Sequence, residues 1–403
     1  MPDAERAFVP PVVGEATPRP PSIWRALLAE PVLAGGAVPW LAPAALDHLG
    51  DPDGERVDLL LGRPVVVPRL ARGHVRVRGA DRVDFLHGQL SQDVRGLAQD
   101  AAAPALLLDH KGRPRAGLTV HRRSDDLYLA IDDGHGPVAL AELRAHVVFD
   151  QVELDDVAEA AVGERGLVAF TFLAGDVATA VGKLGAAFPA LTAGAVGTAV
   201  DQGRTVTVPI VEGGASALLR FGALGPLATV DVALLARDVR EPWHALLAGG
   251  VRPVGERALT AARVAHGVAT VRAEGAHGLP QETGLAGRVH PRKGCYLGQE
   301  IMARVEARGR LRRGLYGLVL DGPLPALGLA AAWRVEDADG AAIGAVGSAA
   351  PAPDGDGWWA LAVLRHDAAE AAADAAGFPW RVRTDGDVPP LGPDAVGAAL
   401  RQL

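Results

Sequence analysis

Cysteine, lysine and tyrosine are nearly absent from this chain of 403 residues, which has one cysteine, three lysines and three tyrosines. One cysteine cannot form an intramolecular disulfide, which is typical of a protein in a reducing compartment. It also cannot supply the thiolates that an iron–sulfur cluster needs, usually about four. The 12 histidines show no metal-ligand spacing. We therefore expect no resident cluster and no metal site in the chain by itself.

The sequence also lacks a positive net charge and long apolar runs. Its net charge of −8 gives no global electrostatic reason to bind nucleic acid or an anionic membrane. No run approaches the ~20 apolar residues that span a bilayer. The proline-rich segment Met1–Pro21, expected to be a flexible tail, has neither the basic start nor the apolar core of a signal peptide. These features predict a cytoplasmic protein without membrane or direct nucleic-acid partners.

The scarce residue types gather in one segment, Lys293–Glu300, which reads KGCYLGQE. It holds the only cysteine, Cys295, together with one of the three lysines and one of the three tyrosines. Such clustering against the bias of the whole chain indicates function. Its glycines permit unusual backbone dihedrals and a close approach to a ligand.

Residues 299–305 have helix-forming character, so Cys295 is expected just before a helix N-terminus. Backbone N–H groups there and the nearby Lys293 would favour the thiolate form. Tyr296, Gln299 and Glu300 add a ring face, an amide and a carboxylate. This composition predicts a polar ligand site or a thiol-reactive site. The alternative is a buried, inert cysteine in a packing loop.

Five arginines follow within ten residues: Arg304, Arg308, Arg310, Arg312 and Arg313. They could bind a polyanion such as a polyglutamate tail, or form a solvated face balanced by Glu300 and Glu306. A second basic cluster, on a predicted hairpin, holds Lys111, Arg113 and Arg115, with the same two interpretations.

The hydrophobic pattern predicts an α+β protein. A first unit has strands at 74–78, 106–108, 116–121 and 127–131, with helices at 82–90 and 137–148. A second has strands at 166–171, 206–211 and 218–221, with helices at 175–187 and 229–248. A helix over 256–267 leads to an irregular glycine-rich stretch. Short strands at 314–320, 331–335, 344–348, 358–364 and 380–384 then predict a small barrel or sandwich.

Three further segments match a known pattern together with KGCYLGQE. They are Val75–Val94, Leu108–Arg113 and Leu279–Leu285. With these the chain resembles the YgfZ-type folate-binding proteins, relatives of the glycine-cleavage T-protein, an aminomethyltransferase. The resemblance covers about residues 55–385.

The resemblance implies three domains around a central channel that binds tetrahydrofolate, with a C-terminal β-barrel domain. The expected boundaries are 1–54 for the N-terminal tail and lead-in, 55–160 and 161–255 for two α+β domains, 256–313 for the connecting helix and signature loop, 314–390 for the barrel, and 391–403 for a tail.

The resemblance also implies a function. One reactive thiol, Cys295, with Lys293, would support the assembly or repair of iron–sulfur enzymes, including tRNA-modifying ones. Folate and iron–sulfur proteins or their assembly factors would be the partners. The folate contacts it implies are Tyr296, Gln299, Glu300, Arg304, Arg263 and Glu282.

The chain departs from the T-protein pattern at the hairpin, where Ala116 and Gly117 stand in place of carboxylates. Neither can take or orient a proton, which argues against aminomethyl transfer. Arg72 and Leu259 stand where some YgfZ-type proteins have aromatic residues flanking folate. Two alternatives remain: a tetrahydrofolate-dependent aminomethyltransferase, and a non-catalytic binding module in which the loop is structural.

Overall fold

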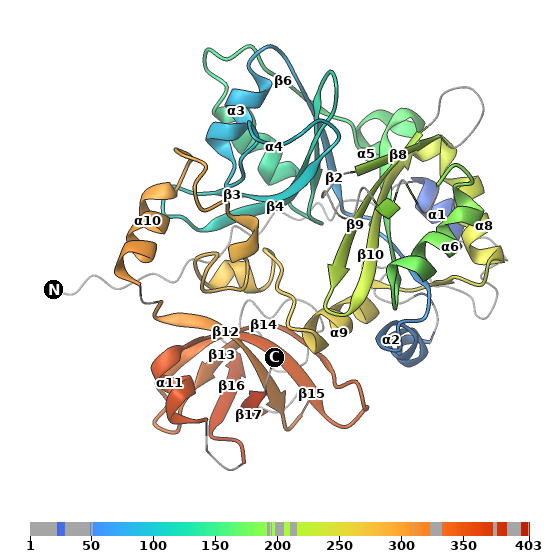
Figure 1. The fold of residues 1–403 in the computed structure, drawn as a ribbon. Helices are drawn as coiled ribbons and strands as arrows, with labels where there is room; N and C mark the ends of the chain where they lie inside the picture. Colours follow the sequence, from blue (N-terminus) through green and yellow to red (C-terminus); the bar gives the residue numbers. More distant parts are fainter. Residues whose placement is uncertain are drawn as a thin grey trace.

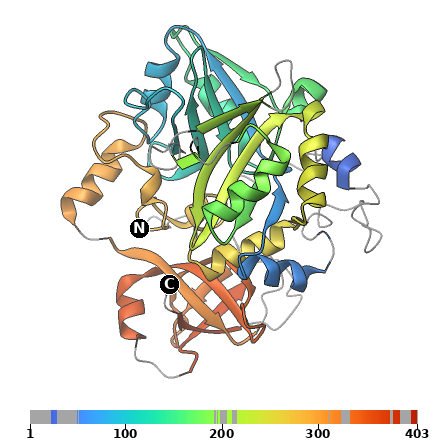
Figure 2. The same ribbon diagram turned by 45° about the vertical axis from the view of Figure 1, so that its right-hand side comes forward.

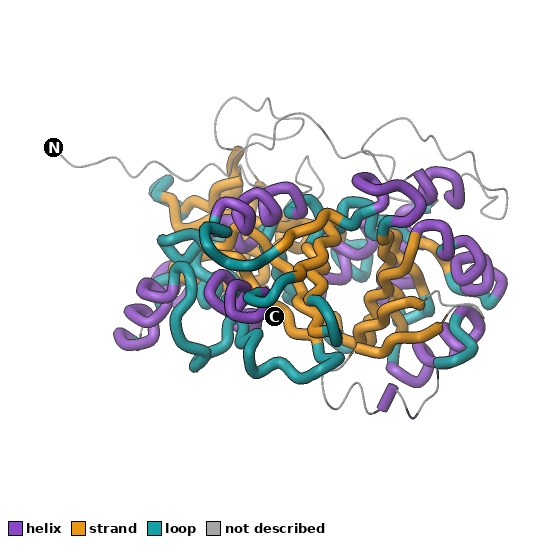
Figure 3. The backbone as a smooth tube through the Cα atoms, turned by 90° about the horizontal axis from the view of Figure 1, so that it is seen from above, coloured by secondary structure: helices purple, strands orange, loops and turns teal. Residues whose placement is uncertain are grey.

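The computed structural model describes residues 22–28, 49, 51–191, 194, 196–197, 205–209, 216–309, 311–322, 333–373, 377–384, 396–401 and 403. The predicted tail up to residue 21 lies outside these ranges. Three β-sheet units, two open sheets and a closed barrel, organise the chain (Figure 1). In Figure 2 the barrel lies below the two open sheets. Seen from above, the strands lie toward the interior and most helices toward the outside (Figure 3).

The first sheet is antiparallel, in the order β3-β4-β5-β2-β6. Its strands are β2 (Gly73–Arg78), β3 (Ala102–Leu108), β4 (Pro114–Arg122), β5 (Leu127–Ile131) and β6 (Glu153–Asp156). Apolar side chains of α3 (Arg82–Gln89) and α4 (Gly136–Ala145) join those of the sheet in one buried core. The strands and helices predicted over 74–148 are therefore confirmed.

The second sheet has the order β11-β1-β7-β10-β9-β8. Its strands are β1 (Val65–Pro68), β7 (Leu167–Ala174), β8 (Thr205–Pro209), β9 (Ser216–Leu224), β10 (Leu227–Leu235) and β11 (Arg252–Pro253). Between β6 and β7 lie the short helices α5 (Glu159–Val162) and η3 (Gly163–Arg165), and η4 (Ala236–Asp238) follows β10. Three helices pack into the core of the second sheet: α1 (Ser22–Leu28), α6 (Val177–Ala187) and α8 (Arg240–Ala248).

The helix predicted over 229–248 is wrong in its first half, which forms strand β10. Val230, Val232 and Leu234 are fully buried, and the residues between them are partly exposed. This alternation has the period of two that a strand requires. Only the second half, α8, is helical.

The first domain was expected to contain all of 55–160, but β1 within that range pairs with β7 of the second sheet. The lead-in before residue 55 also contributes, because Trp24 of α1 is fully buried in the second core. Its ring centroid lies 4.9 Å from that of Trp243. The second unit therefore contains segments that come before the first unit in the sequence as well as segments that come after it.

Helices α2 (Pro52–Leu60) and α9 (Glu256–Ala265) share a smaller core. The opposite side of α9 contacts the barrel, where Ala261 and Val264 pack with Ala350 and Leu361. After α9 come the single-turn helices η5 (Glu274–His277) and η6 (Ala286–Arg288), and then α10 (Gln299–Arg308). None of the helices within the described ranges is both long and apolar enough to cross a membrane.

The barrel closes in the order β12-β15-β14-β13-β16-β17. Its elements are β12 (Arg313–Leu320), β13 (Trp333–Glu336), β14 (Ala342–Pro351), β15 (Trp358–Arg365), α11 (His366–Ala371), β16 (Trp380–Thr384) and β17 (Val396–Arg401). The last strand corrects the expected tail over 391–403, because β17 pairs with both β12 and β16. A barrel without it would leave two unpaired edges.

Replacing Trp24 by alanine tests whether α1 is part of the fold. We expect a loss of about 3–5 kcal/mol in the free energy of unfolding, because the substitution leaves a large cavity in a packed core. Urea denaturation measures this loss. Val162→Ala, at a side chain 48% exposed, is the control and should change stability by no more than ~0.5 kcal/mol. A loss below about 1 kcal/mol for Trp24→Ala would contradict the packing of α1.

Candidate functional site

The signature segment forms a loop that ends where α10 begins, at Gln299. The predicted helix start is therefore confirmed, and Cys295 precedes it by four positions. Cys295 is exposed, so the alternative of a buried cysteine is wrong. In Figure 1 α10 lies at the edge of the molecule. The thiol is thus open to a partner from solvent.

Lys293, two residues before the cysteine, is buried, with only 7% of its surface exposed. Its Nζ donates hydrogen bonds to the carbonyl oxygens of His87 and of Leu90, the latter at 2.7 Å. In return, Nε2 of His87 donates to the carbonyl oxygen of Lys293 at 3.0 Å. The His87 and Leu90 carbonyls stand at the C-terminal end of α3, where a cation is favoured. Lys293 therefore fixes the loop to α3.

Burial lowers the pKa of Lys293 to about 8, although the nearby Asp93 carboxylate opposes the shift. The Tyr296 ring covers the ammonium group, with Nζ 4.8 Å from the ring centroid. A cation so enclosed is held by the carbonyl dipoles and the ring face. These contacts fix the position of Lys293, and its direct role beside the thiol stays a prediction.

The other end of the loop rests on the β3–β4 hairpin. Gly298 has a φ of 83°, and a Cβ at this position would lie 2.5 Å from the carbonyl oxygen of Asp109. Gly112 also has a positive φ, of 75°, and packs against Gly298 and Ile301. Only glycine fits such a conformation and so close an approach. The second glycine of the signature is therefore required by packing.

The remaining predicted ligand residues do not come together. Gln299 accepts a hydrogen bond from the Tyr296 backbone N–H at 3.2 Å, within the loop. Glu300 and Arg304 are exposed on α10. The side chains of Glu306 and Arg308, and all of Arg310, lie outside what the structure describes.

Two predicted contacts lie away from the loop. Arg263 donates to Ser348 Oγ at 3.1 Å and lies 3.7 Å from the buried Glu274, where α9 meets the barrel. Glu282 accepts from the Leu279 N–H at 3.0 Å. Arg263 thus links α9 to the barrel, Glu282 bonds within its own turn, and a folate contact by either residue stays a prediction.

A charged network between the two open sheets was not predicted. Asp231 on β10 lies 3.6 Å from Arg72 and 3.8 Å from Arg220, and accepts a hydrogen bond of 2.7 Å from Thr171 Oγ1. Burial alone would raise the pKa of Asp231, but Arg72 and Arg220 hold it below its ordinary value. Asp231 is therefore ionised at neutral pH.

Arg69 extends this network, because it pairs with Asp133 and lies 3.2 Å from Glu256. The coulombic attraction of Asp133 and Glu256 outweighs desolvation and raises the pKa of Arg69. The network thereby joins the first sheet, the second sheet and the start of α9.

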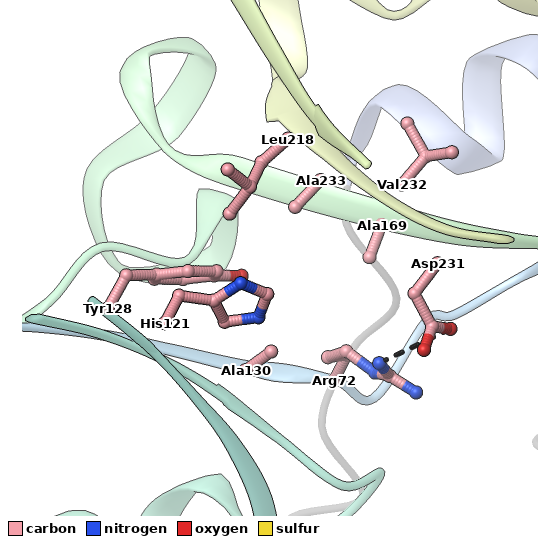
Figure 4. A pocket seen from close by; sticks show the side chains of 9 residues that line it. All are labelled: Arg72, His121, Tyr128, Ala130, Ala169, Leu218, Asp231, Val232 and Ala233. Carbon is pink, nitrogen blue, oxygen red and sulfur yellow. Dashed lines mark ion pairs between the residues drawn. The ribbon is translucent and has the colours of Figure 1, made fainter. Parts of the chain in front are cut away.

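A small cavity adjoins these charges (Figure 4). Its volume of about 20 Å³ has room for roughly one water molecule. The lining residues are Arg72, His121, Tyr128, Ala130, Ala169, Leu218, Asp231, Val232 and Ala233. In Figure 4 the rings of His121 and Tyr128 lie together on one side, and the Arg72–Asp231 pair lies on the other.

The aromatic side of the cavity is uncharged. Tyr128 OH and His74 Nδ1 are 2.6 Å apart. Burial lowers the pKa of His121 and of His74 to about 3, and it raises that of Tyr128. These groups are neutral at physiological pH. Spacing of two along β5 could have indicated that Tyr128 and Ala130 share a face, but not what covers it.

Comparisons with known proteins agree with this architecture. No protein-family model matches the chain. It is 27% identical over 302 residues to the tRNA-modifying protein YgfZ of Yersinia pestis (strain Pestoides F), covering 73% of this chain and 82% of that protein. It is 28% identical over 313 residues to the protein of the same name from Hamiltonella defensa, covering 73% and 81%. The chain is similar to the YgfZ-type proteins.

The fold is that of the glycine-cleavage T-protein. The crystal structure of aminomethyltransferase T from Bartonella henselae matches with a TM-score of 0.64 at 16% identity, over 88% of this chain and 89% of that one. The expected α+β class and C-terminal barrel are thereby confirmed, as is the YgfZ-type resemblance.

The pH dependence of stability tests the burial of Lys293. Its folded pKa, about 8, lies below the ordinary value of 10.5. Between these values the unfolded chain binds more protons, so this group makes stability rise with pH. We expect the difference in unfolding free energy, wild type minus Lys293→Met, to increase from pH 8 to pH 10 in urea denaturation. A difference that stays flat or falls would contradict the assignment.

Proposed function

We propose that this protein is a folate-binding accessory protein that supports iron–sulfur enzymes, tRNA-modifying enzymes among them, through the thiol of Cys295. The observation that carries the proposal is the exposed cysteine on a loop anchored by Lys293 and Gly298. The curated relatives, named tRNA-modifying proteins, support the link to tRNA modification.

The loop geometry suits a thiol that reacts with a partner outside the chain. Cys295 stands at the surface, while its neighbour Lys293 is buried and fixed. An exposed thiol on a fixed loop meets a partner in one orientation, which reduces the entropy lost in reaction. Among the described residues, no group of three or more His, Cys, Asp or Glu side chains could hold a metal ion. We propose that an iron–sulfur cluster would be held by the partner protein and not by this chain.

The cavity has the chemistry for a pterin but not the room. The Asp231 carboxylate could accept from adjacent N–H groups of the heterocycle, and the rings of His121 and Tyr128 offer flat faces. A volume of about 20 Å³ is far below the ~300 Å³ at which ligand pockets begin. Folate binding through this face therefore requires the lining side chains to move apart.

The T-protein fold keeps a second candidate open, a tetrahydrofolate-dependent aminomethyltransferase. Ala116 and Gly117 weigh against it, because neither offers a proton-transferring group. An assay for methylenetetrahydrofolate formation with a lipoylated carrier protein separates the two. We expect no turnover.

Cys295→Ala should abolish function, because it removes the thiol, and should leave the fold intact, because the side chain is exposed. Function is measured in a bacterial strain lacking its YgfZ-type protein, by the content of tRNA nucleosides made by iron–sulfur enzymes. The unfolding free energy should change by no more than ~0.5 kcal/mol. Val162→Ala serves as the control. Full restoration of the nucleosides by Cys295→Ala would show that the thiol is not needed for function.

Titration with tetrahydrofolate tests the ligand. We expect saturable binding below about 100 μM, measured by calorimetry, and at least a tenfold loss in Ala130→Leu, because the added side chain fills the cavity. Ala141→Leu, on the exposed face of α4, is the matched control. Absence of binding, or equal affinity in both variants, would contradict a folate site on this face.

A further inference from the structure

The chain just before the cysteine loop is attached to the first sheet by Arg288. Its Nη1 lies 2.7 Å from Oδ2 of Asp132. Its carbonyl oxygen accepts a hydrogen bond of 2.6 Å from Ser91 Oγ, and the His290 N–H donates to the Ser91 carbonyl at 2.9 Å. The attachments by Lys293 follow directly along the chain. The Arg288 ion pair is therefore the first of a series of contacts that lead to Cys295.

The ion pair occupies space that a side chain on β4 would otherwise fill. A Cβ on Gly117 would overlap the Asp132 carboxylate and lie 2.6 Å from Arg288 Nη1. The Asp132 N–H donates to the Gly117 carbonyl oxygen at 2.8 Å, so the two residues are direct neighbours across the sheet. Gly117, which stands where the T-protein hairpin has a carboxylate, thus makes room for the Asp132 carboxylate at the end of β5.

The same face of the sheet leads to the cavity. Because side chains alternate along a strand, Asp132 lies on the face of Tyr128 and Ala130, both of which line the cavity. Asp133, the next residue, pairs with Arg69 in the network between the sheets. The end of β5 therefore connects the charged interior to the segment that carries the cysteine.

We infer that Asp132 and Arg288 are positioning residues that set the reactivity of Cys295 by fixing the chain that leads to Lys293. This rests on the proposed thiol function, but its test needs neither folate nor a client protein. Loss of the pair removes one attachment of residues 288–292 and leaves those to Ser91, so Lys293 and the exposed loop that carries Cys295 are held less firmly in one orientation.

The test is the rate at which iodoacetamide alkylates the full-length protein at pH 7.5. The label reports only on Cys295, because the chain has one cysteine. We expect Asp132→Asn and Arg288→Met each to slow alkylation by about threefold to fivefold, the upper part of the range for a partly exposed ion pair. The double variant should be no slower than either single one, since both remove the same interaction.

The chain offers a matched control. The Arg115–Glu142 pair, which joins β4 to α4, has the same distance, 2.7 Å, and side chains 22% and 27% exposed, against 27% and 25% for Arg288 and Asp132. Glu142→Gln should leave the rate within twofold of wild type. An equal slowing in Glu142→Gln would show a general loss of stability and overturn the proposal.

A further variant, Gly117→Ala, disturbs the Asp132–Arg288 pair by adding a methyl group beside it. It keeps both charges but displaces them, so it should slow alkylation as Asp132→Asn does. Thermal unfolding identifies any variant that fails to fold, and the remaining variants then decide. An unchanged or faster rate in folded Asp132→Asn and Arg288→Met overturns the inference. Loss of function in Cys295→Ala, with unchanged alkylation in these variants, would sink it and leave the proposed function standing.

Discussion

The site depends on one buried cation, the ammonium group of Lys293. Its hydrogen bonds to carbonyls at the end of α3 connect two segments about 200 positions apart in the sequence. A lysine with 7% exposure keeps its charge only if fixed dipoles replace water. That requirement fixes the backbone on both sides of it. Gly298 can then meet the hairpin at close range, and Cys295, between these two anchors, is left at the surface.

A second set of charges organises the interior. Asp231 holds two arginines where the open sheets face each other, and Arg69 carries the network to α9. Removal of one partner from a buried ion pair leaves the other charge uncompensated, which is destabilising. The cavity beside them has a volume of only about 20 Å³. Any ligand of this face competes with ion pairs already formed.

The sequence predicted what depends on local pattern. Strand β5, the start of α10 and most of the barrel follow from alternation and turn residues. It missed β10 because an apolar run was assigned to a longer helix, and it missed β17 because the strand comes after a proline-rich stretch. Rarity and clustering of residue types located the cysteine loop. The partners of Lys293, and the pairing of Asp132 with Arg288, join distant segments, which one sequence does not reveal.

We propose that folding makes Cys295 more reactive than the same cysteine in an unstructured peptide. The direct measurement is its alkylation rate in the intact protein, compared with that in a free peptide of Lys293–Glu300 in the same buffer at pH 7.5. Both thiols are accessible, so a difference reports on the fixed loop. We expect faster alkylation in the folded protein. An equal or slower rate there would show that the fold does not activate the thiol and that the loop is structural.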